Sequence, residues 1–132
     1  MEQDIHIKTN QAEAKQCESQ LRENIVALQK YEKMLSNIMY TNEKMNLDMK
    51  GIEISMEELK KKPKEVYRFY GMILLKKPFD EIKTELEEEK DKITLRQKQL
   101  TKQEESIKKM YSELRQKVID MQKELRETVG KK

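Results

Sequence analysis

Residues 60–78 read KKKPKEVYRFYGMILLKKP, and no other part of the chain departs so clearly from helical sequence. Pro63 removes a backbone donor and stops a helix, whereas Pro78 suits the first turn of a new one. Between them, residues 66–69 and 72–76 are β-branched, aromatic or aliphatic on either side of Gly71. Two such runs joined at a glycine predict a β-hairpin.

The register of this hairpin depends on its loop. A two-residue loop at Tyr70-Gly71 would give one face to Tyr67, Phe69, Met72 and Leu74, and the other to Val66, Arg68, Ile73 and Leu75. Tyr-Gly is weaker turn chemistry than Asn-Gly, so a bulge or a longer loop is the alternative. An isolated hairpin is marginal in water, and its apolar second strand needs other chains to cover it. We therefore expect the hairpin to join subunits through Val66, Tyr67, Phe69, Gly71, Met72, Ile73, Leu74 and Leu75.

The residues before the hairpin keep one heptad phase over eight repeats. The sixteen core positions are Ile7, Asn10, Ala14, Cys17, Leu21, Asn24, Leu28, Tyr31, Leu35, Ile38, Asn42, Met45, Met49, Ile52, Met56 and Leu59. Thirteen of them are apolar, and the other three are asparagines. A pattern of this length predicts a coiled-coil helix. Gly51 is its one internal weakness.

A second helical pattern runs from Phe79 to just before Gly130. Its core positions are Phe79, Ile82, Leu86, Glu89, Ile93, Arg96, Leu100, Gln103, Ile107 and Met110, then Tyr111, Leu114, Val118, Met121, Leu125 and Thr128. The slip from Met110 to Tyr111 predicts a stutter. If the helices fold back with Leu59 beside Phe79, Asn42 faces Arg96 and Asn24 faces Leu114.

These patterns predict a single domain over 1–132, dominated by α-helix: helix 1–62, β-hairpin linker 63–78 and helix 79–129. The two helices form an antiparallel coiled coil. Charged residues make up 40% of the chain and hydrophobic residues 36%. That is too little apolar material for a globular α/β core, and too regularly placed for a disordered chain.

Composition and motifs exclude several classes of function. The 28 basic and 25 acidic residues are interspersed, so we expect no nucleic-acid partner. The longest apolar run, Met72–Leu75, is far too short to span a membrane, and the polar start shows no signal peptide. One free thiol, Cys17, fits a reducing compartment, and we expect a soluble cytoplasmic protein. With His6 as the only histidine and no phosphate loop, we expect no enzyme, no metal and no cofactor.

Two further features have alternative interpretations. The cluster Lys60–Lys64 resembles a nuclear import signal or phosphate site, but lysines at a helix C-terminus also favour the helix dipole. With Lys76-Lys77 it would form a basic collar able to attract an acidic partner surface. Most of the nine methionines lie at or beside core positions, where they fill the core between the helices, or near the tips they offer an adaptable binding surface.

The stretch Glu65–Lys77 resembles the linker of β-class prefoldin subunits: Val-Tyr-Lys, two variable residues, Gly, then an aliphatic strand ending in a basic residue. Residues 80–88, 93–100 and 102–105 are also similar to the second helix of that family. Tyr70 and Met72 depart from it, because the family often has smaller residues or proline beside this glycine.

The resemblance implies a hetero-hexamer of two α-class and four β-class subunits, whose hairpins assemble into intersubunit β-barrels. Six coiled coils project from this platform and hold unfolded polypeptides, notably actin and tubulin, without ATP. The client then passes to a group II chaperonin. Frayed coiled-coil ends leave core residues partly uncovered, so we expect clients to bind at Ile5, Ile7, Val118, Met121, Leu125 and Val129. The alternative function is a structural or tethering coiled-coil homodimer, which an apolar hairpin disfavours because a hinge needs polar, flexible residues.

Overall fold

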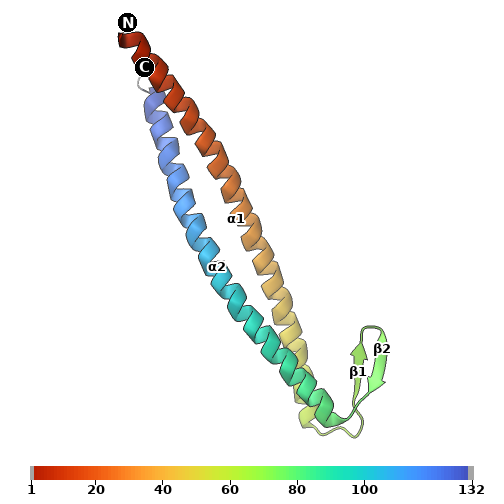
Figure 1. Cartoon of the computed structure of the whole chain (residues 1–132). Coiled ribbons are helices and arrows are strands. Elements are labelled where there is room, and N and C mark those ends of the chain that lie inside the picture. Colours follow the sequence, from red (N-terminus) through yellow and green to blue (C-terminus); the bar gives the residue numbers. More distant parts are fainter. Residues whose placement is uncertain (1, 131–132) are drawn as a thin grey trace. The chain divides into compact units, whose positions relative to one another are not determined.

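The computed structural model describes the backbone of residues 2–130 and the side chains of residues 11–128 (Figure 1). The order of elements is α1 (Glu2–Lys60), β1 (Tyr67–Tyr70), β2 (Ile73–Lys76) and α2 (Phe79–Gly130). Two long helices with an antiparallel hairpin between them are the predicted fold class, which is confirmed. By its internal contacts the chain divides into two units, one of residues 38–103 and one of residues 1–37 with 104–132.

The unit of residues 38–103 contains the hairpin and the helix segments that adjoin it. Its core is a cluster of buried Ile52 and Leu59 from α1 with Ile82 and Leu86 from α2. Ile38 and Met45 are also buried. Together with Ile52 and Leu59 they lie seven residues apart, so the predicted core face of this helix is the buried one.

In the other unit, the start of α1 packs antiparallel to the end of α2. Its most buried side chains are Ile107, Val118 and Met121. Polar contacts cross the same seam: Asn24 Nδ2 donates to Met121 Sδ at 3.4 Å, and Tyr111 Oη donates to Glu32 Oε1 at 3.0 Å. The core positions of α1 are thus covered by α2 of the same chain.

The predicted helix register was wrong by at least one turn. Asn24 contacts Met121 and not Leu114, and in the other unit Gln97 donates to Asn46 at 2.7 Å. At the start of the fold-back, Leu59 packs in one cluster with Ile82 and Leu86. These two residues lie further into α2 than Phe79, the residue that was expected to face Leu59.

The stutter of α2 lies near its start, and not at Met110 as predicted. Arg96, Gln103 and Met110 are exposed. The partly or fully buried residues are instead spaced by three and four residues in unbroken alternation: Lys90, Ile93, Gln97, Leu100, Glu104, Ile107, Tyr111, Leu114, Val118, Met121 and Leu125. Ile82 and Leu86 precede Lys90 by two successive steps of four, which is a stutter. The heptad phase predicted from the sequence placed Glu89 in the core. In the structure Glu89 forms an ion pair with Arg68 of the hairpin.

The hairpin pairs Phe69 with Leu74 and Tyr70 with Ile73, so its loop is Gly71-Met72 and not Tyr70-Gly71. Gly71 has a φ of +64°, whereas Met72 does not have a positive φ. A turn with φ above zero only at its first central residue is type II′, which requires glycine there and explains the shift. The register differs from the predicted one by two residues, and side chains alternate between faces with a period of two. The remaining residues therefore keep their predicted faces, but Met72 is in the loop and Tyr70 is in strand β1.

Candidate functional site

Strand β2 is exposed on both of its faces. Ile73 is 61% exposed, Leu74 51% and Leu75 45%, and Met72 in the loop is fully exposed. Alternate residues of a strand point to opposite faces, so Leu74 lies on one face and Ile73 and Leu75 on the other. Three consecutive aliphatic residues are therefore about half exposed, with uncovered apolar surface on both faces of the strand.

Strand β1 has an outer and an inner face. Tyr67 and Phe69 are exposed, Phe69 at 69%, whereas Arg68 and Tyr70 are half-buried and turn toward α2. The hairpin is thus attached to the helix through one face of β1, and β2 with its free edge remains available.

The attachment is a network of charged and phenolic groups centred on Glu85 of α2. Arg68 Nη1 lies 2.7 Å from Glu85 Oε2, and a second guanidinium nitrogen of Arg68 pairs with Glu89. Tyr70 Oη donates to the same Glu85 oxygen at 2.7 Å, and Lys77 Nζ lies 2.8 Å from Glu85 Oε1. The Lys77 ammonium also lies 4.5 Å from the centroid of the Tyr70 ring. Strand β1, the residue that follows β2 and helix α2 are thus joined at one carboxylate.

Electrostatics keep this network charged at neutral pH. The hydrogen bond from Lys77, and then those from Tyr70 and Arg68, lower the pKa of Glu85 to about 2. The same contact with Glu85 raises the pKa of Lys77, and the hydrogen bond to Glu89 raises the pKa of Arg68. Hydrogen bonds to the ionised form of a carboxyl stabilise that form, so Glu85 accepts from all three donors throughout the physiological range.

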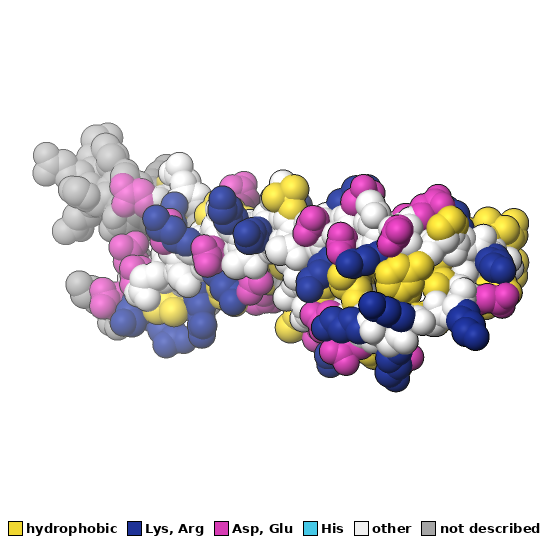
Figure 2. All heavy atoms as spheres, turned by 90° about the horizontal axis from the view of Figure 1, so that it is seen from below, with side chains coloured by type: hydrophobic (Ala, Val, Ile, Leu, Met, Phe, Trp, Pro, Cys, Tyr) yellow, Lys and Arg dark blue, Asp and Glu magenta, His cyan; other side chains and the backbone are white. Residues whose placement is uncertain are grey.

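Sequence reasoning missed an exposed apolar row on the outer face of α1. Tyr40, Leu47 and Ile54 are 71%, 68% and 65% exposed and lie seven residues apart. Leu47 and Ile54 line hollows that also contain Arg68 of the hairpin. The sequence contains the pattern that predicts this row, because the three residues share one heptad position. That position lies on the side of the helix away from the core, where residues are normally polar. Figure 2 shows apolar side chains gathered among charged ones at the end that carries the hairpin.

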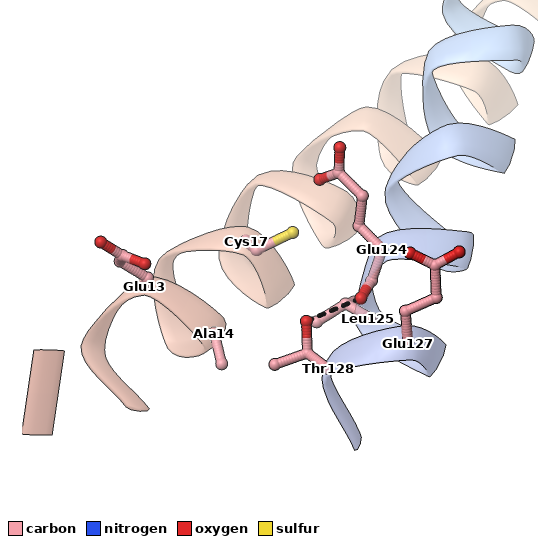
Figure 3. Close-up of a pocket in the computed structure, with 7 residues that line it drawn as sticks. All are labelled: Glu13, Ala14, Cys17, Glu124, Leu125, Glu127 and Thr128. Atoms are coloured by element: carbon pink, nitrogen blue, oxygen red, sulfur yellow. Dashed lines mark hydrogen bonds between the residues drawn. The ribbon is translucent and has the colours of Figure 1, made fainter. Parts of the chain in front are cut away.

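The predicted client residues lie in different environments. Val118 and Met121 are buried between the helices, so they are not accessible while the helices stay paired. Leu125 is half-buried and lines an open cleft of about 500 Å³ together with Ala14, Cys17 and Thr128 (Figure 3). Figure 3 shows the Ala14 and Thr128 side chains pointing toward one another across this cleft. The side chains of Ile5, Ile7 and Val129 lie outside the described residues.

No arrangement for metal chemistry is found among the described side chains. None of them forms a group of three histidine, cysteine, aspartate or glutamate residues that could hold a metal ion. Within the same residues, no helix is both long and apolar enough to cross a membrane. His6 lies outside the described side chains, and Cys17 lines the cleft beside Leu125. The features that stand out are the exposed apolar residues of β2 and of α1, which are typical of surfaces that contact other chains.

Comparisons with known proteins agree with this interpretation. The family model for prefoldin subunits matches residues 22–125. The chain is 31% identical to prefoldin subunit beta of Archaeoglobus fulgidus, over 75% of this chain and 88% of that protein. It is 28% identical to prefoldin subunit beta of Methanothrix thermoacetophila, over 84% and 88%. The crystal structure of the prefoldin beta subunit from Thermococcus strain KS-1 has the same fold, with a TM-score of 0.66, 23% identity and coverage of 81% and 93%.

Proposed function

This chain belongs to the prefoldin subunit family, and from that membership we propose that it is a β-class subunit of a hetero-hexameric co-chaperone. Its partners are sibling subunits of the α and β classes. The assembly holds unfolded polypeptides of the actin and tubulin type without ATP and delivers them to a group II chaperonin. The observation that carries the proposal is the hairpin, whose second strand is apolar and exposed on both faces.

The hairpin is the assembly element because its exposed surface cannot be covered from within the chain. Burying what remains exposed of Ile73, Leu74 and Leu75 contributes on the order of 3 kcal/mol per subunit. β2 also presents one unpaired edge, which a strand of a sibling subunit can extend. Barrels formed by several hairpins remove such edges altogether, which favours a closed intersubunit β-barrel.

The network at Glu85 supports this role by setting the direction of the hairpin. Arg68 and Tyr70 hold β1 on α2. The free edge of β2 and the face of the hairpin that carries Phe69 therefore point away from that helix. A pre-oriented hairpin loses less conformational freedom when it enters a barrel. Leu47 and Ile54, which line hollows beside the hairpin, extend the same assembly surface onto α1.

Client holding is assigned to the tips of the coiled coil. Leu125 beside its cleft supplies partly uncovered apolar surface, and the sequence places Ile5, Ile7 and Val129 in the same region. Val118 and Met121 take part only where the helices separate, because they are buried in the pair. Six such tips around one client would act together through effective concentration, so each contact can be weak.

Two measurements on the complex isolated from its own cells test the proposal. Native mass spectrometry should show a hexamer of mixed subunits, and a homodimer of this chain alone would overturn the proposed assembly. Denatured actin should aggregate less in the presence of the hexamer, without ATP, as measured by light scattering. Replacing Ile5, Ile7, Leu125 and Val129 by serine should remove most of this protection.

A matched set of substitutions separates the tips from the rest of the surface. Val26, Met39, Leu95 and Met110 are exposed apolar residues of both helices that belong neither to the hairpin nor to the four replaced positions. Their replacement by serine removes apolar surface without touching the tips, so protection should persist. Equal protection by both variant hexamers would place client binding elsewhere, while the measured mass of the assembly would stand.

A further inference from the structure

A small cleft lies where α1 ends and α2 begins, and the proposed function does not use it. Its volume is about 330 Å³. Met56, Leu59 and Phe79 form its apolar wall, and three lysines line it as well: Lys60, Lys62 and Lys83. The cleft thus combines apolar side chains with one lysine from each helix and one from the residues that follow α1.

Within the described residues, these three lysines, like Lys64 beside them, form no ion pair. Lys61 pairs with Glu58 at 3.0 Å, and Lys77 pairs with Glu85 at 2.8 Å. Within the described part of the chain, no carboxylate oxygen lies within 4.0 Å of the ammonium groups that line the cleft. Their positive charge is therefore not neutralised by a neighbouring carboxylate and is available to an anionic group in the cleft.

The backbone at Lys62 provides a second, independent observation. Lys62 has a φ of 51°, and its N–H donates to the Leu59 carbonyl at 3.1 Å to close the end of α1. Glycine or asparagine normally occupies this left-handed position, because a side chain there is strained. Attraction to the helix dipole accounts for Lys60 in the last turn. It does not account for Lys62, which lies beyond the helix, or for Lys83, which belongs to α2.

We propose that this cleft binds an acidic peptide segment of a partner protein, in which one aliphatic or aromatic side chain is flanked by carboxylates. The apolar side chain contacts Met56, Leu59 and Phe79, and the carboxylates pair with the three lysines. A phosphate or a nucleic-acid backbone would match the charges but would leave the apolar wall uncovered. This site belongs to the unit of residues 38–103, whereas Leu125 belongs to the other unit, so the test of this site is independent of the test of client holding.

The test measures binding of a fluorescently labelled short peptide with one leucine between glutamates, by anisotropy, to the purified full-length protein in its native assembly. Changing Lys60, Lys62 and Lys83 together to glutamine should weaken binding about tenfold, since each exposed ion pair contributes roughly two- to threefold. Changing Lys44, Lys50 and Lys98 to glutamine removes the same charge from exposed sites outside the cleft. This control should alter the affinity by less than about twofold.

Two changes of the probe examine the apolar and ionic contacts separately. Replacing its leucine by serine should weaken binding to the wild-type protein, and raising the salt concentration from about 0.05 M to about 0.5 M should do the same. Equal weakening by the two lysine sets would mean general charge attraction and would overturn the site. So would a peptide that does not bind while vesicles of phosphatidylserine do, because the cleft would then recognise an anionic membrane.

Discussion

At the residue scale, one carboxylate determines how the hairpin is attached. Glu85 accepts from Lys77, Tyr70 and Arg68, three residues that the linker contributes from different positions. Its pKa lies far below the ordinary value of 4.5 because these donors stabilise the ionised form. Since the folded-state pKa is lowered, the contribution of Glu85 to the attachment is present above pH 4.5. It is lost as the pH falls toward 2.

We therefore predict that the Glu85 carboxyl titrates with a midpoint of about 2, followed by carbon NMR of its side chain. Changing Lys77 to methionine should raise this midpoint toward 4.5, because the Lys77 hydrogen bond is the largest cause of the shift. Changing Lys61 to methionine, which breaks only the pair with Glu58, is the control and should leave the midpoint of Glu85 unchanged. A Lys77 variant with an unaltered midpoint would contradict the network.

Two glycines at exposed sites should respond to the same substitution with opposite sign. Neither would have a neighbour within 4 Å of an added Cβ, so only backbone conformation differs. Changing Gly51 to alanine should raise the free energy of unfolding by about 1 kcal/mol, because Gly51 lies inside a helix. Changing Gly71 to alanine should lower it by roughly 1 kcal/mol, because its φ is +64°. Urea unfolding of the assembled protein measures both, and shifts of equal sign would refute the argument.

At the element scale, the helices and the hairpin meet different needs. The helices cover one another's core positions within the chain, as the burial of Ile52 and Leu59 against Ile82 and Leu86 shows. The hairpin has no such cover for β2. The same chain therefore combines a helix pair whose apolar faces cover one another with a hairpin whose apolar strand β2 stays exposed. This is the arrangement expected of a subunit that assembles through its linker.

Changing Phe69 and Ile73 together to aspartate should prevent assembly while the helices remain folded. Phe69 and Ile73 lie on opposite faces of the hairpin, so a barrel would have to bury at least one unpaired charge. Native mass spectrometry should show release from the proposed hexamer, and circular dichroism should show unchanged helix content. Val26 and Leu95, which are similarly exposed, provide the control pair for aspartate. Incorporation of the hairpin variant at the wild-type yield would show that assembly occurs elsewhere.

At the scale of the whole molecule, the direction of the chain distinguishes a prefoldin-like subunit from an extended rod. Cys17 near the start of α1 and Leu125 near the end of α2 line the same cleft. An antiparallel pair within one chain brings these distant positions together, whereas a parallel homodimer of straight chains would not.

Spin labels at native Cys17 and at a cysteine replacing Leu125 should lie about 10–20 Å apart, given a helix spacing of 8–10 Å and the reach of the labels. Dilution with unlabelled protein makes the measured distance intramolecular. A separation several times larger in the diluted sample would indicate a rod. It would favour the tethering alternative over the fold-back.

The sequence by itself determined the helices, the hairpin and the family. Helical periodicity along α1 and the alternating apolar runs around Gly71 are local properties, readable from neighbours a few residues apart. The family resemblance at Glu65–Lys77 rested on the same short-range pattern. Even the exposed row of Tyr40, Leu47 and Ile54 was visible as a heptad position, although it was overlooked.

Only the tertiary structure decided where these elements meet. The type II′ turn at Gly71-Met72, the stutter between Leu86 and Ile93 and the partner of Asn24 each differed from expectation. Nothing in the sequence distinguishes Glu85 from the other aspartates and glutamates, of which the chain has 25 in all. These features depend on contacts between residues tens of positions apart. Such contacts are selected by the packing of whole surfaces, so a periodic sequence is compatible with several registers until the side chains are brought together.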